Sequence, residues 1–157
     1  QQKWAGAIKG ISKVHKEGGD YIKAAGEAAG ELYAYGHSNV LFKPTKAADV
    51  PFRPTGADAM SYFVGKDAVE DGYDEDGGFA INGGKGWKSC VYDNHQVELK
   101  GGIGLAMGNY YFTCATTGDN GPRSSTVHVW LHALRRRQGA HLPPPLVGAV
   151  RGVSESN

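Results

Sequence analysis

The sequence of 157 residues lacks most features that indicate a particular chemistry. Its two cysteines, Cys90 and Cys114, are too few for a disulfide framework, and we expect buried free thiols, with a disulfide as the alternative. The formal net charge of +1 gives no electrostatic indication of a nucleic-acid partner. No apolar run approaches the roughly 20 residues that cross a bilayer. We therefore expect no nucleic-acid partner and no transmembrane segment.

Motifs of metal, phosphate and nucleophile chemistry are missing too. The chain contains no phosphate-binding glycine loop, no Cys-x-x-Cys pair and no nucleophile elbow. His128 and His132 have the spacing of two ligands on a helix, but their segment is strand-like, so they would be well separated. The acidic stretch at residues 67–78 lacks the regular ligand spacing of a calcium loop, because Tyr73 and Gly78 interrupt it. We expect a solvated loop there, no metal site and no cofactor.

The end of the chain lacks residue types that the rest contains. No lysine follows Lys100, and no aromatic residue, isoleucine, methionine or aspartate follows Trp130. Three consecutive prolines at residues 143–145 interrupt any strand there. Because a domain usually ends in an element that packs on its core, we divide the chain into one domain at residues 1–127 and an atypical tail at residues 128–157.

Hydrophobic periodicity predicts helices in the first half of the chain and strands in the second. Apolar residues at helical spacing predict helices at about residues 3–17 and 21–32, and Thr55 is a suitable N-cap for a third helix that ends at Gly65. Strands are expected at residues 39–42, 87–92, 95–99, 103–114 and 125–131. A turn is expected at residues 93–94. This order predicts an α+β fold, a cone-shaped domain with N-terminal helices packed on a curved antiparallel sheet around a pocket.

Four segments of the chain resemble one known family. They are residues 39–45 (Asn-Val-Leu-Phe-Lys-Pro-Thr), 51–55 (Pro-Phe-Arg-Pro-Thr), 61–65 (Ser-Tyr-Phe-Val-Gly) and 105–113 (Leu-Ala-Met-Gly-Asn-Tyr-Tyr-Phe-Thr). Together they resemble the iota-class carbonic anhydrases of the nuclear transport factor two and SnoaL-like superfamily, which is close to the kinase association domains. The resemblance extends from about Trp4 to Val127. It implies a homodimer of cone-shaped α+β domains or a subunit of a larger assembly, and it suggests a plastid as the compartment.

The resemblance also implies an activity and two site residues. Some members of the family hydrate carbon dioxide without a metal and hold bicarbonate inside the cone through a threonine, a tyrosine and a serine from a C-terminal His-His-Ser-Ser stretch. Thr45 and Tyr62 match the first two. A hydroxyl and a phenol can orient water and an anion, but neither is basic enough to deprotonate water, so a nearby histidine would assist. The alternative is structural: Thr45 ends a turn, and Tyr62 is a core aromatic residue with a satisfied hydroxyl.

The tail departs from the family pattern in a way that a frameshift explains. When residues 127–151 are back-translated with all permitted codons and read one base later, the first part can read Tyr-Thr-Phe-Gly-Tyr-Thr. The part from Leu134 can read Tyr-Ala-Asp-Gly-Lys-Val-Arg-Ile-Phe-Leu-His-His-Ser-Ser-Val-Pro-Tyr, which resembles the family's last strands. We therefore favour a frameshift near Val127 over a natural arginine-rich tail. With the written tail, the sheet would lose its last strand and the activity would be impaired.

Two functions stay open on the sequence alone. The first is a metal-independent carbonic anhydrase-like interconversion of carbon dioxide and bicarbonate, with Thr45 and Tyr62 at the anion. The second is a non-catalytic assembly or small-ligand-binding module, because this fold hosts many unrelated roles. The chain begins at Gln1 rather than methionine, so we expect a processed form or an excised piece, and the sequence does not indicate a compartment.

Overall fold

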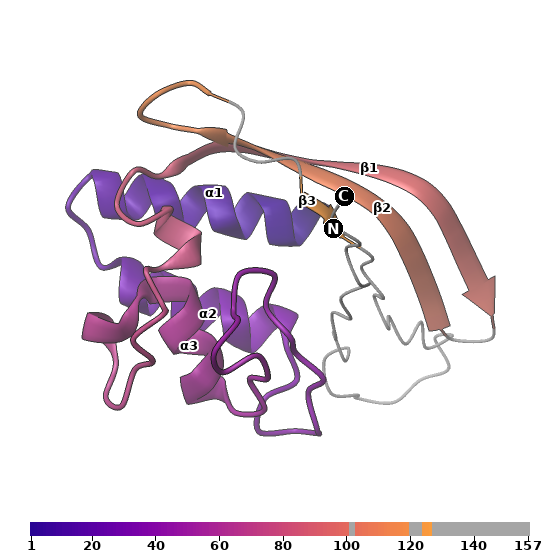
Figure 1. The fold of residues 1–157 in the computed structure, drawn as a ribbon, viewed down its shortest axis with the longest axis horizontal. Helices are drawn as coiled ribbons and strands as arrows, with labels where there is room; N and C mark the ends of the chain where they lie inside the picture. Colours follow the sequence, from indigo (N-terminus) through magenta and orange to yellow (C-terminus); the bar gives the residue numbers. More distant parts are fainter. Residues whose placement is uncertain (101–102, 120–123, 127–157) are drawn as a thin grey trace, which may run out of the picture.

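Three helices and an antiparallel sheet make up the fold in the computed structural model, which describes residues 1–100, 103–119 and 124–126. The helical elements are α1 (Gln2–Lys16), α2 (Tyr21–Leu32), α3 (Gly56–Val64) and the short 3-10 helices η1 (Lys66–Ala68) and η2 (Phe79–Ile81). The strands are β1 (Trp87–Lys100), β2 (Ile103–Cys114) and β3 (Ser124–Thr126), paired in the order β1-β2-β3. The β1–β2 hairpin curves, and α1 lies along its inner face with α2 and α3 beyond it (Figure 1). The predicted α+β fold is confirmed.

Local sequence signals set the ends of the helices. The Asp20 side chain caps α2 by accepting a hydrogen bond from the backbone N–H of Lys23. Thr55 and Asp58 form a capping box at the start of α3, in which each side chain accepts from the backbone N–H of the other residue. Gly65 ends α3 with a φ of 98°, a backbone conformation that glycine adopts at little cost. The three helix predictions are confirmed to within one residue.

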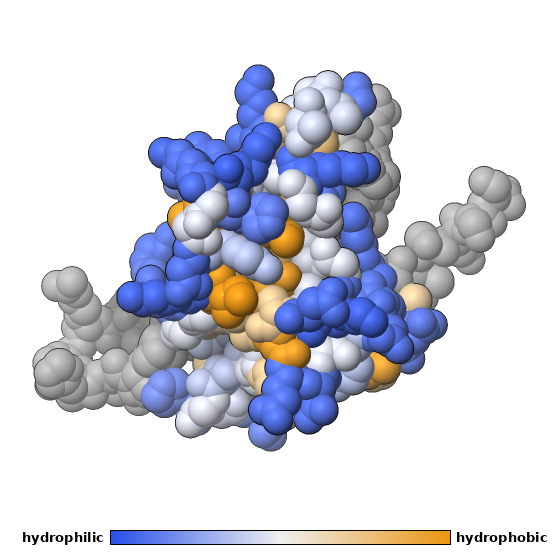
Figure 2. Space-filling model, turned by 90° about the vertical axis from the view of Figure 1, so that its left-hand side faces the viewer, coloured by the Kyte–Doolittle hydropathy of each residue, from blue (hydrophilic) through white to orange (hydrophobic). Residues whose placement is uncertain are grey.

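Aromatic rings fill the space between α1 and the sheet. The Trp4 ring on α1 has its centroid 6.1–6.3 Å from those of four other rings, belonging to Phe79, Tyr92, Tyr110 and Phe112. Such rings bury large apolar areas and prefer the tilted and edge-to-face contacts seen here. Figure 2 shows one end of the molecule, where hydrophobic side chains lie in the middle and hydrophilic ones surround them. The core therefore holds the inner face of the sheet against the helices.

Two details of the strand prediction are wrong. Residues 39–42 form no strand, and only Phe42 forms an isolated β-bridge. Its carbonyl oxygen accepts a hydrogen bond from the backbone N–H of Arg53 at 2.9 Å. The neighbouring prolines cannot donate to a ladder, which keeps the pairing this short. Residues 93–94 do not turn the chain either, because β1 continues through them. The register shifts between Asn94 and Gln96, so that His95 forms a β-bulge within one long bent strand.

The remaining predictions for the fold can be placed briefly. Cys90 and Cys114 are both free thiols, as expected, but only Cys114 is buried and Cys90 is partly exposed. No helix within the described ranges is long and apolar enough to span a bilayer. The strand predicted at residues 125–131 begins as β3, and its other residues lie outside the described part of the chain, as does the tail predicted at residues 128–157.

The bulge at His95 requires a residue without a side chain at Gly108, opposite it on β2. A Cβ atom at Gly108 would lie 2.7 Å from the Asn94 Cα and closer still to the Asp93 carbonyl oxygen. Since these are backbone atoms, we expect Gly108→Ala to lower the free energy of unfolding by about 1–3 kcal/mol in urea denaturation.

The matched control for this change is Gly104→Ala, on the same face of β2. Its new Cβ atom would meet only the end of the Leu99 side chain, at 3.2 Å, and Leu99 is exposed. The control is expected to cost clearly less stability. Equal losses in the two variants would contradict the constraint that the bulge places on Gly108.

Candidate active site

Three hydroxyl groups from separate segments come together in the interior. Thr45, in the irregular segment before α3, shares a hydrogen bond of 2.6 Å with the hydroxyl of Tyr110 on β2. Tyr62 on α3 is 5% exposed, and the backbone of Lys46 is hydrogen-bonded to its hydroxyl. The structure thus brings the two predicted site residues to neighbouring positions. It adds Tyr110, which sequence reasoning missed although it lies in the shared segment at residues 105–113.

Burial determines the protonation of the phenols around this cluster. Desolvation raises the pKa of Tyr62 well above its ordinary value, and the nearby Tyr110 phenol raises it further. Burial also raises the pKa of Tyr33, whose hydroxyl accepts the Trp4 indole N–H at 3.0 Å, and that of Tyr92. These groups stay protonated at neutral pH. They can therefore donate hydrogen bonds, and they cannot act as bases there.

Aromatic rings form the walls beside the cluster, and a lysine lies over them. The Tyr62 ring stacks on Phe79 with centroids 5.2 Å apart, and Phe79 in turn contacts Trp87 at 6.1 Å. The exposed Lys46 ammonium is 5.9 Å from the Phe79 centroid and 5.8 Å from that of Trp87. Apolar walls with a few placed polar groups are typical of small-molecule sites. The positive charge lies on the residue directly after Thr45.

A buried ion network adjoins the cluster. The Arg53 side chain is fully buried and donates to both carboxylate oxygens of Asp76, at 2.8 and 3.1 Å, and to Glu75 at 3.0 Å. Its guanidinium lies over the ring of Tyr73 at 4.1 Å. Ser61, the residue before the site tyrosine, donates to Asp76 at 2.6 Å. A charge this deeply buried needs such partners: both terminal nitrogens of Arg53 are paired, whereas its buried Nε atom has no hydrogen-bond partner in the described part of the chain.

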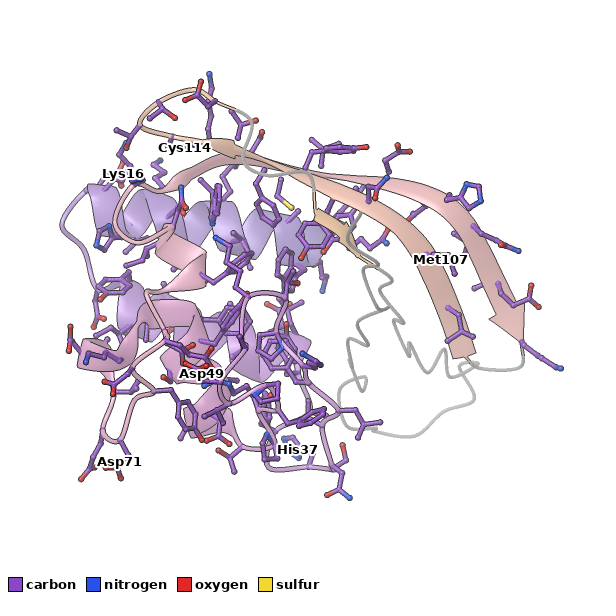
Figure 3. All side chains as sticks on the ribbon, viewed as in Figure 1. Lys16, His37, Asp49, Asp71, Met107 and Cys114 are labelled. Atoms are coloured by element: carbon purple, nitrogen blue, oxygen red, sulfur yellow. The ribbon has the colours of Figure 1, made fainter. Side chains whose placement is uncertain are left out.

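Glu75 holds part of the irregular segment through its backbone. Its carboxylate accepts hydrogen bonds from the backbone N–H groups of Ala48, Asp49 and Val50, at 2.6, 3.0 and 2.8 Å. These bonds lower the pKa of Glu75 to about 2, and Arg53 lowers it further in the same direction. Figure 3 shows Asp49 among the helices and loops below the sheet. Glu75 is therefore ionised throughout the range near neutral pH.

The prediction of a solvated loop at residues 67–78 is wrong at one end of that loop. Asp71 is exposed and lies at the loop's outer end (Figure 3), and the Asp74 side chain is 94% exposed. The Asp76 side chain is only 2% exposed and that of Glu75 13%. The reason lies in the partners: both carboxylates bind the buried Arg53, and Glu75 also accepts three backbone N–H groups, none of which the acidic pattern of the loop reveals.

The described histidines lie on other elements than the three site hydroxyls. Among residues 1–100, 103–119 and 124–126, no group of three or more histidine, cysteine, aspartate or glutamate side chains could hold a metal ion. His15 packs edge-on against Tyr21 with ring centroids 4.8 Å apart. His95 is exposed on β1, and His37 is exposed on the side of the helices away from the sheet (Figure 3). His128 and the other histidines lie outside the described residues.

Fold and site together define a class of protein: an α+β domain whose helices pack on a curved antiparallel sheet and whose aromatic interior carries hydrogen-bonding hydroxyls. Comparison with known proteins identifies the family. The family model described as metal-independent carbonic anhydrase matches residues 1–127, and the chain belongs to this family. The predicted family is therefore confirmed.

Two relatives give the extent of the likeness. The metal-independent carbonic anhydrase of Nostoc sp. is 34% identical over 119 residues, which cover 72% of this chain and 54% of the relative. The chain thus spans about half the length of that relative. The crystal structure of an iota-carbonic anhydrase from a cyanobacterium, complexed with bicarbonate, matches with a TM-score of 0.73 at 24% identity. That match covers 98% of this chain and 89% of the other, and it shows a shared fold.

Proposed function

We propose that this protein interconverts carbon dioxide and bicarbonate without a metal ion. The observation that carries the proposal is the meeting of the Thr45, Tyr62 and Tyr110 hydroxyls beside aromatic walls. Membership of the metal-independent carbonic anhydrase family supports it. So do the relatives, since one is named for this activity and the other was crystallised with bicarbonate.

The cluster suits a substrate that changes from an apolar molecule to an anion. Carbon dioxide is uncharged and compatible with aromatic surroundings, whereas bicarbonate needs donors for its oxygens. The backbone of Lys46 is hydrogen-bonded to the Tyr62 hydroxyl, which leaves the Tyr62 proton available for the anion. In the bond between Thr45 and Tyr110 either oxygen can be the donor, and when Tyr110 donates, the Thr45 proton can turn to an incoming anion. The Lys46 ammonium adds a favourable charge nearby.

Hydration also needs a base that takes a proton from water. Protonated phenols and a threonine hydroxyl do not accept that proton at neutral pH, whereas a histidine does. We propose that the base comes from the His-His-Ser-Ser stretch that a one-base shift of the reading frame would restore. This stretch would lie among residues outside the described part of the chain, so its role stays a prediction.

Tyr62→Phe tests the catalytic role of the hydroxyl cluster, because it removes one donor and keeps the ring. We expect kcat/KM for carbon dioxide hydration to fall roughly ten- to hundredfold, since a hydrogen bond to a charged group contributes about 1.5–3 kcal/mol. Stopped-flow pH-indicator assays in the presence of a chelator measure this rate.

The control for that assay is Tyr21→Phe, which likewise removes a hydroxyl and keeps the ring, but on a side chain that packs against His15. It should leave the rate unchanged. An unchanged rate in Tyr62→Phe would exclude the assigned role of this residue. The absence of turnover in a protein whose tail carries His-His-Ser-Ser would favour the non-catalytic ligand-binding module instead.

We also propose a homodimer that forms through the outer face of the sheet. Tyr110 points to the core, so alternate residues of β2 point outward, and Leu105 and Met107 among them are exposed. Figure 3 shows Met107 on the hairpin beyond the end of α1.

We expect a mass near twice 16.7 kDa in analytical ultracentrifugation, and a monomer for Met107→Asp. The control is Val97→Asp. Val97 pairs with Ala106, the neighbour of Met107 on β2, and therefore lies on the opposite face of the sheet. Dissociation by both variants, or by neither, would contradict the assigned face.

The reading of the tail can be tested directly in the native protein. The family match ends at residue 127, where the proposed change of reading frame begins. We expect peptide mapping by mass spectrometry to find peptides that contain His-His-Ser-Ser. Peptides that contain residues 138–142 as written, Gln-Gly-Ala-His-Leu, would show that the arginine-rich tail is real.

A further inference from the structure

The segment that carries Thr45 has no regular structure of its own to hold it. Residues 43–54 contain neither helix nor strand. Backbone groups in such a segment must find hydrogen-bond partners outside a regular ladder. Within residues 48–50 those partners are the two oxygens of a single side chain, Glu75, which accepts three backbone N–H groups in succession. The position of Thr45, three residues before this stretch, therefore depends on where Glu75 is held.

The segment that carries Tyr62 is attached to the neighbouring carboxylate. Ser61, on the same turn of α3, donates to Asp76 at 2.6 Å and accepts the backbone N–H of Tyr73 at 2.9 Å. Asp76 itself is bound by two guanidinium nitrogens of Arg53. The helix that carries the site phenol is thus attached to the same acidic loop that holds the Thr45 segment.

Arg53 joins these two attachments into one unit. Its Nη2 atom donates both to Glu75, at 3.0 Å, and to Asp76, at 3.1 Å. Because the adjacent carboxylates of Glu75 and Asp76 bind the same buried guanidinium, moving either of them breaks a charge-assisted hydrogen bond in the interior, which is costly. A rigid connection therefore runs from residues 48–50 through Glu75, Arg53 and Asp76 to Ser61.

We propose that Glu75 is a positioning residue for the carbonic anhydrase site: through the backbone of residues 48–50 and through Arg53, it sets the place of Thr45 relative to Tyr62. Glu75 would not touch bicarbonate itself. The role rests on the proposed function, since it assigns a use to the arrangement of the two hydroxyls. Placement of donors matters because displacement by about 1 Å can cost a hundredfold in rate.

Glu75→Gln tests this role in the full-length protein, because the amide keeps the size of the side chain and loses the charge. We expect kcat/KM for carbon dioxide hydration to fall about tenfold. We also expect hydrogen exchange at the amides of residues 48–50 to become about tenfold faster or more. Asp74→Asn is the matched control, since Asp74 is the preceding acidic residue and pairs on the surface with Lys66. It should change neither quantity.

A double-mutant cycle separates positioning from a general loss of stability. If Glu75 acts through Thr45, Glu75→Gln should lower kcat/KM by no more than about twofold when Thr45→Val is already present. A full, additive loss in that background would overturn the proposal, as would unchanged exchange at residues 48–50. Inactivity of the unmutated protein would overturn the proposed function and the positioning role with it, whereas the exchange data would still show whether Glu75 holds the segment.

Discussion

The buried guanidinium of Arg53 is the point on which the arrangement of the interior depends. It pairs with the adjacent carboxylates of Glu75 and Asp76, and through them it connects an irregular segment to helix α3. Hydrophobic contact can bring these segments together, but it has no direction and does not fix their relative position. Ionic hydrogen bonds in a dry environment do, because each has a preferred geometry and leaving any one unmade is costly.

That fixed frame explains how a site can be built from weak groups. A threonine hydroxyl and phenols carry no charge, and burial keeps the phenol of Tyr62 protonated. In the proposed hydration of carbon dioxide, their contribution would be to donate hydrogen bonds where negative charge develops, which is effective when the donors are already in place. The aromatic rings beside them make the surroundings less polar than water, which strengthens these interactions. A fixed arrangement of neutral donors would then stabilise the developing negative charge, as the positive charge of a metal ion does in metal-dependent sites.

The sequence predicted those parts of the molecule whose signals are local. Caps and apolar spacing place the helices, and resemblance to the family, rather than the chemistry of the residues, selects Thr45 and Tyr62. Tyr110 could have been added, because it lies in a shared segment and, by the two-residue period of a strand, faces inward with Phe112 on β2. The bulge at His95 could not have been predicted. The Asp and Asn before it are typical of a turn, and the glycine that permits the bulge, Gly108, is on the opposite strand. The pairing of Arg53 with carboxylates 22 and 23 residues away was also hidden, because no periodicity links such segments.

A crystal structure of this protein with bicarbonate would show whether the hydroxyl cluster holds the anion. The account predicts the anion between Thr45 and Tyr62, with at least one of its oxygens accepting a hydrogen bond from each hydroxyl and with Arg53, Glu75 and Asp76 paired as described. Bicarbonate bound elsewhere, or the bond between Thr45 and Tyr110 intact with no anion beside it at saturating bicarbonate, would contradict the account.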